Sequence, residues 1–205
     1  MGGAGYSGSK CEKHAETGSE KMLWNHLKSN FRPQLVGVKS SSSSSVLSKD
    51  IISIFQNFAT GLNCAFIHAK KPKEFLLDGA ICDTAINPKG AFPFPTESYW
   101  GIEWEWDPSP PKWQEFIVHD FIKLFHFSSD RKVAIYLRDK NFNPNARSEV
   151  ESSMKSYYPN KSIQINIDII EIERIGSGNS YTLDMHLLRL TQNRINQIDT
   201  IRIFP

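Results

Sequence analysis

Hydrophobic and polar positions recur along this chain with two different periods, and their order predicts an α/β domain. Apolar residues return every three or four positions over about 48–60 and again over 111–127, which is the spacing of an amphipathic helix. Short apolar runs typical of buried strands fall at four places: 62–69, 75–82, 99–106 and 132–138. The predicted order is helix, three strands, helix and strand, in a mixed sheet flanked by helices.

The N-terminal segment, residues 1–45, differs from the rest in composition. Its start is rich in Gly and Ser, and a short helix is predicted from Ser19 to about Asn30. The run Ser40–Ser45 is of low complexity, so we expect a flexible linker there. Residues 46–205 are then expected to form one domain, with its core over 46–140.

A C-terminal extension rich in β structure is predicted beyond that core. A helix is expected around 146–157, followed by two strand-like segments at 162–175 and 180–190. The residues between these strands, 176–179, are typical of a hairpin turn, because the glycines tolerate a positive φ. The alternation of isoleucines changes phase at 169–170, which predicts a β-bulge there.

Composition changes this picture little, but it excludes several classes of protein. Lys+Arg number 24 and Asp+Glu 22, so the formal net charge of +2 gives no sign of a protein that coats polyanions. Hydrophobic residues make up 40% of the chain, which is too many for a disordered protein. No apolar stretch reaches the roughly 20 residues of a spanning helix, so no membrane association is expected. The three cysteines, Cys11, Cys64 and Cys82, lack CxxC spacing and favour a reducing cytoplasm.

Candidate chemistry lies on the third predicted strand. Glu103 and Glu105 are two residues apart, so their side chains share one face of the sheet, roughly 6–7 Å apart. Three tryptophans take the opposite face, where we expect core packing: Trp100, Trp104 and Trp106. Asp78 lies in the otherwise apolar preceding strand, where a buried carboxylate is costly without a partner. The three acids are therefore expected to converge.

Converging carboxylates destabilise one another in the ionised form unless a cation or a proton intervenes. Oxygen ligands of this kind suit Mg²⁺ or Mn²⁺, ions that also bind phosphate oxygens. Such an ion activates water and stabilises charge on a phosphoryl group. Asp78, Glu103 and Glu105 are therefore candidate metal ligands.

The order of elements, together with Asp78 and the run Glu103-Trp104-Glu105, resembles the PD-(D/E)XK nuclease superfamily, which has the restriction-endonuclease-like fold. The resemblance covers about residues 46–140 and implies an αβββαβ core. In that family an acid on the second core strand and an acid-any-Lys motif on the third build the metal site. Here Leu77-Asp78 stands in the place of Pro-Asp, Glu103 matches the first acid of the motif, and Glu105 replaces its lysine. This Glu-any-Glu form is similar to that of BamHI-type restriction enzymes.

The resemblance also implies a role for the helix after the third strand. Some relatives supply the lysine from that helix, where Lys123 shares a helix face with Glu115 and His119. The implied activity is that of a Mg²⁺-dependent or Mn²⁺-dependent DNA endonuclease of restriction or repair type. Glu105 or Lys123 would act on the attacking water. A homodimer fits this expectation, because cutting both strands of a duplex commonly uses two active sites.

The residues leave other interpretations open. Glu171-Ile172-Glu173 repeats the spacing of the acid pair, so that spacing alone is a weak signal. Glu103 and Glu105 also suit the paired carboxylates of a glycoside hydrolase, and a non-catalytic nuclease-like module that binds nucleic acid or protein is a third possibility. Seven basic residues suit either a groove for phosphates beside the acids or ordinary surface charge: Lys70, Lys71, Lys73, Arg131, Lys132, Arg138 and Lys140.

Overall fold

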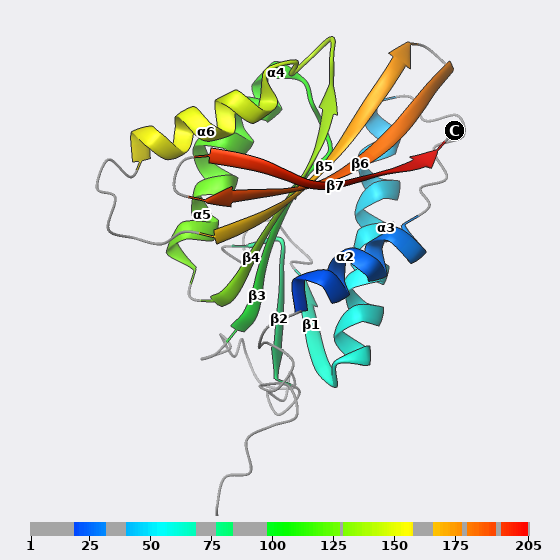
Figure 1. Ribbon diagram of the computed structural model, residues 1–205, viewed down its shortest axis with the longest axis vertical. Coiled ribbons are helices and arrows are strands. Elements are labelled where there is room, and N and C mark those ends of the chain that lie inside the picture. Colours follow the sequence, from blue (N-terminus) through cyan, green and yellow to red (C-terminus); the bar gives the residue numbers. More distant parts are fainter. Residues whose placement is uncertain are drawn as a thin grey trace, which may run out of the picture.

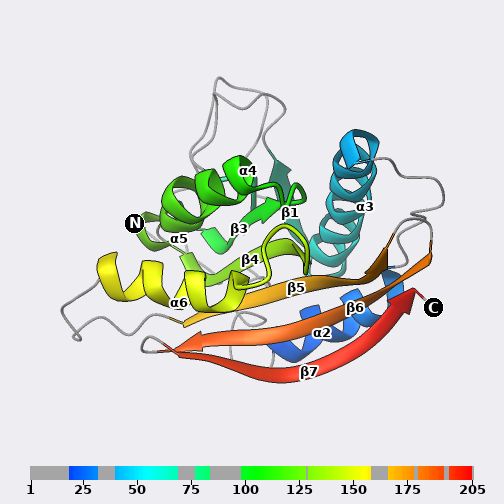
Figure 2. The same cartoon turned by 90° about the horizontal axis from the view of Figure 1, so that it is seen from above.

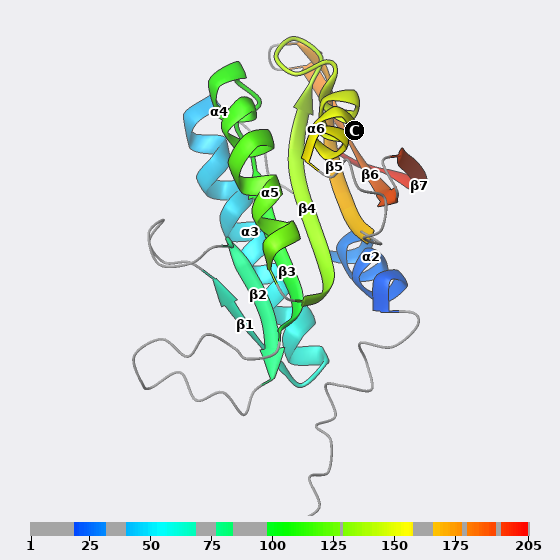
Figure 3. The same ribbon diagram turned by 90° about the vertical axis from the view of Figure 1, so that its left-hand side faces the viewer.

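The computed structural model describes residues 19–31, 40–68, 77–83, 98–127, 129–157, 166–177, 180–191 and 194–204. It is an α/β structure with one seven-stranded mixed sheet, in which the strands follow one another in chain order (Figure 1). The strands are β1 Cys64–His68, β2 Gly79–Asp83, β3 Ser98–Glu105, β4 Ser129–Asp139, β5 Asn166–Ser177, β6 Ser180–Thr191 and β7 Arg194–Phe204. The sheet twists strongly from β1 to β7 (Figure 3).

Strand directions divide the sheet into three parts. The strands β1, β2 and β3 form an antiparallel meander, and β5, β6 and β7 form a second one. The central pairs β3–β4 and β4–β5 are parallel. Parallel neighbours need a crossover connection, and both crossovers carry helices. The first contains α4 Pro110–Glu115, the π-helical turn η1 Phe116–Asp120 and α5 Phe121–His126, and the second contains α6 Ala146–Tyr157.

Helices cover both faces of the sheet (Figures 1 and 2). The helices α2 Ser19–Asn30 and α3 Ser40–Gly61 pack on one face, in a core that includes Trp100 and Ile102 of β3 and the following Trp106. The helices α4, α5 and α6 pack on the other face with η1, in a second core that includes Ala134 and Tyr136 of β4. The predicted succession of helix, three strands, helix and strand is present in this architecture.

The serine run is helical, contrary to the expected linker. Helix α3 begins at Ser40 and continues through the predicted amphipathic segment to Gly61. Once the apolar part of a helix is nucleated by packing, each further residue adds a hydrogen bond at little cost, so serines can extend it. The predicted linker at 40–45 was therefore wrong, whereas the short helix α2 lies where it was expected.

The predicted helix over 111–127 is interrupted by η1. The Phe121 N–H donates to the Phe116 carbonyl, which is the five-residue step of a π-helix. In an uninterrupted α-helix, Asp120 would share a face with Trp113, Ile117 and Leu124, which are buried. The wide turn rotates Asp120 away from that face and leaves it partly exposed.

The C-terminal extension contains one more strand than expected. The strands β5 and β6 confirm the two predicted segments, and Gly176 at the hairpin has a φ of 118°. The pairing of β5 runs without a register shift through 169–170, so the predicted bulge was wrong. Ile167 and Ile169 pack in one core while Ile170 and Ile172 pack in the other, because both faces of β5 are covered. The strand β7, from Arg194, was not predicted.

Two further expectations concern cysteines and membranes. Cys82 is a buried free thiol, but Cys64 is disulfide-bonded, which runs against the expectation of thiols kept reduced. None of the helices within the described residues is long and apolar enough to cross a membrane.

Candidate functional site

Asp78 and Glu103 lie beside each other at the beginning of β2. In the antiparallel β2–β3 pair Gly79 is opposite Ile102, which places the preceding Asp78 next to Glu103. The Asp78 carboxylate accepts the Trp104 N–H at 2.9 Å and is hydrogen-bonded to the Glu103 carboxyl group. Asp78 was expected inside the strand, but it lies in a bend immediately before β2. The structure nevertheless brings these two acids together.

Glu103 is the most deeply buried acid of this group. Its side chain is 1% exposed, and its buried Oε1 has no hydrogen-bond partner among the described residues. Burial, and then the negative charge of Asp78, raise the pKa of Glu103 to about 11. Burial also raises the pKa of Asp78, although the hydrogen bonds from Glu103 and Trp104 oppose this shift. At neutral pH the pair therefore retains a proton, which a bound cation would replace.

Glu105 lies on the same face of β3 but in a separate environment. It accepts the Asp107 N–H at 2.7 Å, at the point where β3 leads toward α4. Burial is the main cause that raises the pKa of Glu105 to about 7. A carboxyl group with that pKa can accept a proton near neutral pH. The structure thus distinguishes Glu105, a potential base, from the coupled pair of Asp78 and Glu103.

Lys123 reaches the acids from α5. Its Nζ lies 3.9 Å from Glu103 Oε1 and 2.6 Å from Asp120 Oδ1. Burial alone would lower the pKa of Lys123, but the hydrogen bond to Asp120 and the charge of Glu103 raise it, so the lysine is a cation at neutral pH. The expected placement of Lys123 beside the third strand is therefore present in the structure.

Asp120 is a site residue that sequence reasoning missed. Its 2.6 Å ion pair with Lys123 places it next to the site, and its charge contributes to raising the pKa of Asp78, Glu103 and Glu105. Four-residue spacing connected Lys123 with Glu115 and His119 instead. The three-residue spacing of Asp120 and Lys123, which also brings side chains together on a helix, was the signal in the sequence that could have found it.

The remaining expectations about this region concern the tryptophans and the basic residues. The tryptophans of β3 pack on the face opposite the acids, in the core with α2 and α3, as expected. Arg138 forms ion pairs with Glu171 and Glu173, so it does not line a groove beside Asp78. Lys70, Lys71 and Lys73 lie outside the described residues.

A second acidic cluster lies farther along the sheet. Glu171 and Glu173 of β5 and His186 of β6 place potential ligand atoms within 4.8 Å of one another. Glu171 is already bound by Arg138 and Arg147, and it accepts the Tyr136 hydroxyl at 2.9 Å. Two guanidinium groups neutralise this cluster and would repel a cation. We therefore assign it a structural role, which also accounts for the second Glu-any-Glu run.

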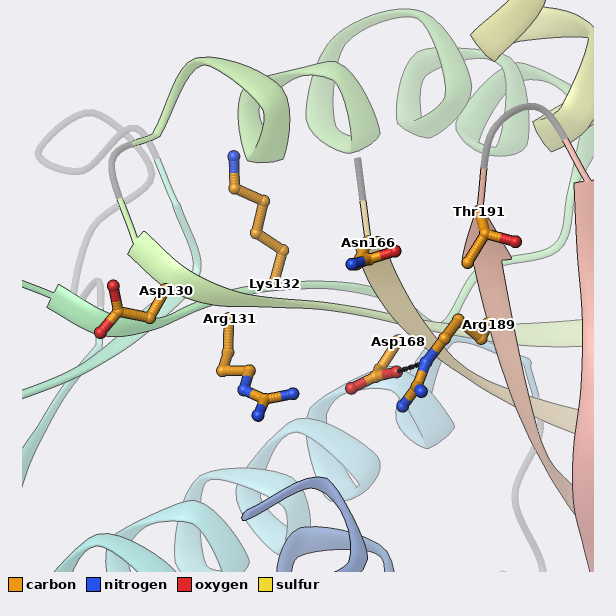
Figure 4. A pocket seen from close by; sticks show the side chains of 7 residues that line it. All are labelled: Asp130, Arg131, Lys132, Asn166, Asp168, Arg189 and Thr191. Atoms are coloured by element: carbon orange, nitrogen blue, oxygen red, sulfur yellow. Dashed lines mark hydrogen bonds and ion pairs between the residues drawn. The ribbon is translucent and has the colours of Figure 1, made fainter. Parts of the chain in front are cut away.

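One open cavity, of about 530 Å³, lies where β4 and β5 begin and β6 ends (Figure 4). Asp78, Glu103 and Glu105 do not line it. Its lining is polar and comprises Asp130, Arg131, Lys132, Asn166, Asp168, Arg189 and Thr191. Arg189 forms an ion pair of 2.9 Å with Asp168 across the β5–β6 ladder. Arg131 and Lys132, two of the basic residues considered for a phosphate groove, thus line this cavity instead of the acidic site.

The acidic site combines a proton-sharing pair of carboxyl groups, a nearby cation and a carboxyl group of near-neutral pKa. Asp78 and Glu103 are chemically suited to hold a hard divalent ion, because they offer converging oxygen ligands. Comparison with known proteins gives no further guidance: no family model, no curated protein and no solved structure matches this chain.

Proposed function

We propose that this protein is a metal-dependent nuclease that hydrolyses phosphodiester bonds of DNA, with Asp78 and Glu103 holding Mg²⁺ or Mn²⁺. The observation that carries the proposal is a buried Glu103 oxygen, beside a second carboxyl group, that has no hydrogen-bond partner among the residues the structure describes. A buried oxygen without a hydrogen-bond partner lowers the stability of the folded protein unless a ligand binds to it. A divalent ion supplies that partner and removes the repulsion within the pair.

The resemblance to PD-(D/E)XK nucleases supports this proposal through the order of elements. A helix, an antiparallel three-stranded meander, a helical crossover and a parallel fourth strand are the parts of an αβββαβ core. Asp78 at the start of the second strand and Glu103 on the third occupy the positions that the resemblance implies. Glu105 departs from the family's lysine, and Lys123 supplies an ammonium group from α5 instead.

The chain's own residues have distinct roles in the proposed hydrolysis. The bound ion would polarise the phosphoryl group and lower the pKa of a water molecule. Glu105 accepts a proton from the attacking water as the new phosphorus–oxygen bond forms and the bond to the leaving oxygen breaks. Lys123 stabilises the negative charge that develops on the phosphoryl oxygens. The glycoside-hydrolase alternative has less support, because Glu103 is paired with Asp78 and not with Glu105.

The first test is a cleavage assay with supercoiled plasmid and with single-stranded DNA, in Mg²⁺, Mn²⁺ or EDTA. We expect metal-dependent cleavage by the wild type, and a loss of about 100-fold or more in Asp78→Ala and Glu103→Ala. Asp130→Ala is the matched control, because this exposed acid lies outside the site. If the folded protein cleaves neither DNA but binds DNA without metal, and Glu103→Gln leaves that binding unchanged, the non-catalytic module replaces the nuclease.

A further inference from the structure

The π-helical turn η1 ends at the residue that holds Lys123. An extra residue in one turn changes which side chains a helix presents to its neighbours, and such turns occur frequently at functional sites. Here the turn takes Asp120 off the apolar face formed by Trp113, Ile117 and Leu124. Asp120 then lies beside Lys123, and its negative charge contributes to raising the pKa values of Asp78 and Glu103.

The contacts of Lys123 show what Asp120 does there. The 2.6 Å hydrogen bond from Lys123 Nζ to Asp120 Oδ1 is much shorter than the 3.9 Å separation from Glu103 Oε1. Among the described residues, Asp120 and Glu103 are the only acids within ion-pair distance of this ammonium. Glu115 is bound to Lys112 at 2.7 Å and is not available to Lys123.

We infer that Asp120 is a positioning residue for Lys123 and holds its ammonium group beside Glu103. Without Asp120 the lysine side chain, which is 36% exposed, would extend into solvent, because its separation from Glu103 is too long for a strong hydrogen bond. Asp120 thereby fixes the ammonium where a substrate phosphate would meet it. This role rests on the proposed nuclease function.

A double-mutant cycle tests the role in the full-length protein. We expect Asp120→Ala to lower the rate of plasmid cleavage at saturating metal and DNA about 10-fold, while the KM for DNA stays within about twofold. In the Lys123→Ala background the same change should have no further effect, because Asp120 acts through the lysine. Asp120→Asn, whose oxygen still accepts a hydrogen bond, should retain an intermediate rate. Additive losses in the double variant would overturn the inference.

Two further measurements separate this inference from the nuclease proposal. Acetylation of Lys123 by acetic anhydride, quantified by mass spectrometry, should be several-fold faster in Asp120→Ala than in the wild type. Glu115→Ala is the matched control, because it removes an acid paired at the same spacing with a different lysine. Unchanged acetylation in Asp120→Ala would show that Asp120 does not hold Lys123. If Lys123 is acetylated faster in Asp120→Ala but the wild type does not cleave DNA, the nuclease proposal has failed and the contact between Asp120 and Lys123 is still supported.

Discussion

Asp78, just before β2, and Glu103, near the end of β3, are hydrogen-bonded to each other, and one oxygen of Glu103 is buried without a hydrogen-bond partner in the described part of the chain. Two acids in contact at low dielectric cannot both ionise unless a cation joins them. Ionising both carboxyl groups without a cation is therefore unfavourable, and this has measurable consequences for the stability of the protein and for the proposed metal binding.

The first prediction concerns Glu103→Gln and the pH dependence of stability. The unfolded glutamate loses its proton near pH 4.5, whereas the folded one keeps it to about pH 11. The raised pKa therefore makes the free energy of unfolding fall as pH rises from 4.5 toward 11. Glutamine resembles the protonated acid and has no such dependence. Without added metal, Glu103→Gln should be about 1–3 kcal/mol more stable than the wild type at pH 8.

Urea unfolding of both proteins at pH 5 and pH 8 measures this difference. The advantage of the variant should be smaller at pH 5, where less of the unfolded glutamate is ionised. A variant less stable than the wild type at pH 8 would show that Glu103 is ionised and held by another cation.

The second prediction is that metal binding releases a proton. The Asp78–Glu103 pair holds a proton at pH 7, and a divalent ion must displace it before both carboxylates can act as ligands. Calorimetric titration with Mg²⁺ or Mn²⁺ in two buffers of different ionisation enthalpy should give about one proton released for each ion. Asp78→Asn should abolish the binding. Binding without any buffer dependence would contradict a shared proton.

The third prediction distinguishes the two acidic clusters. Glu171 is buried between Arg138 and Arg147, so Glu171→Gln removes the ion-pair partner of Arg147 and leaves Arg138 with Glu173 alone. We expect a loss of about 3 kcal/mol in the free energy of unfolding, measured by urea denaturation. The affinity for Mn²⁺ should be unchanged, because the proposed ligands are Asp78 and Glu103. Loss of Mn²⁺ binding by folded Glu171→Gln would move the metal to the second cluster.

The fourth prediction tests how α2 is attached to the sheet. Trp24 is buried on α2, and its indole N–H donates to Asp199 Oδ2 of β7 at 2.6 Å. Trp24→Phe keeps most of the apolar contact but loses this hydrogen bond. The free energy of unfolding should fall by about 1 kcal/mol, against about 3–5 kcal/mol for Trp24→Ala. Equal losses in the two variants would show that packing contributes nothing at this position.

The hydrophobic pattern by itself determined the succession of elements around the site. Helical spacing marked α3 and the crossover between β3 and β4, and apolar runs marked the strands, because these periods follow from local backbone geometry. The same alternation placed Glu103 and Glu105 on the face opposite the tryptophans of β3. These features depend on neighbours in sequence, so one sequence was sufficient to predict them.

Other features depended on contacts between distant segments, and only the tertiary structure decided them. Helices cover both faces of the sheet, so isoleucines on either face of β5 are buried without a β-bulge. The strand β7 was not predicted, because it is placed in the sheet by its pairing with β6 and not by its own sequence pattern. The π-helical turn took Asp120 off the apolar face of the helix, and the pairing of β2 with β3 placed Asp78 beside Glu103. Burial and the charges of neighbouring strands set a pKa, and sequence spacing contains neither.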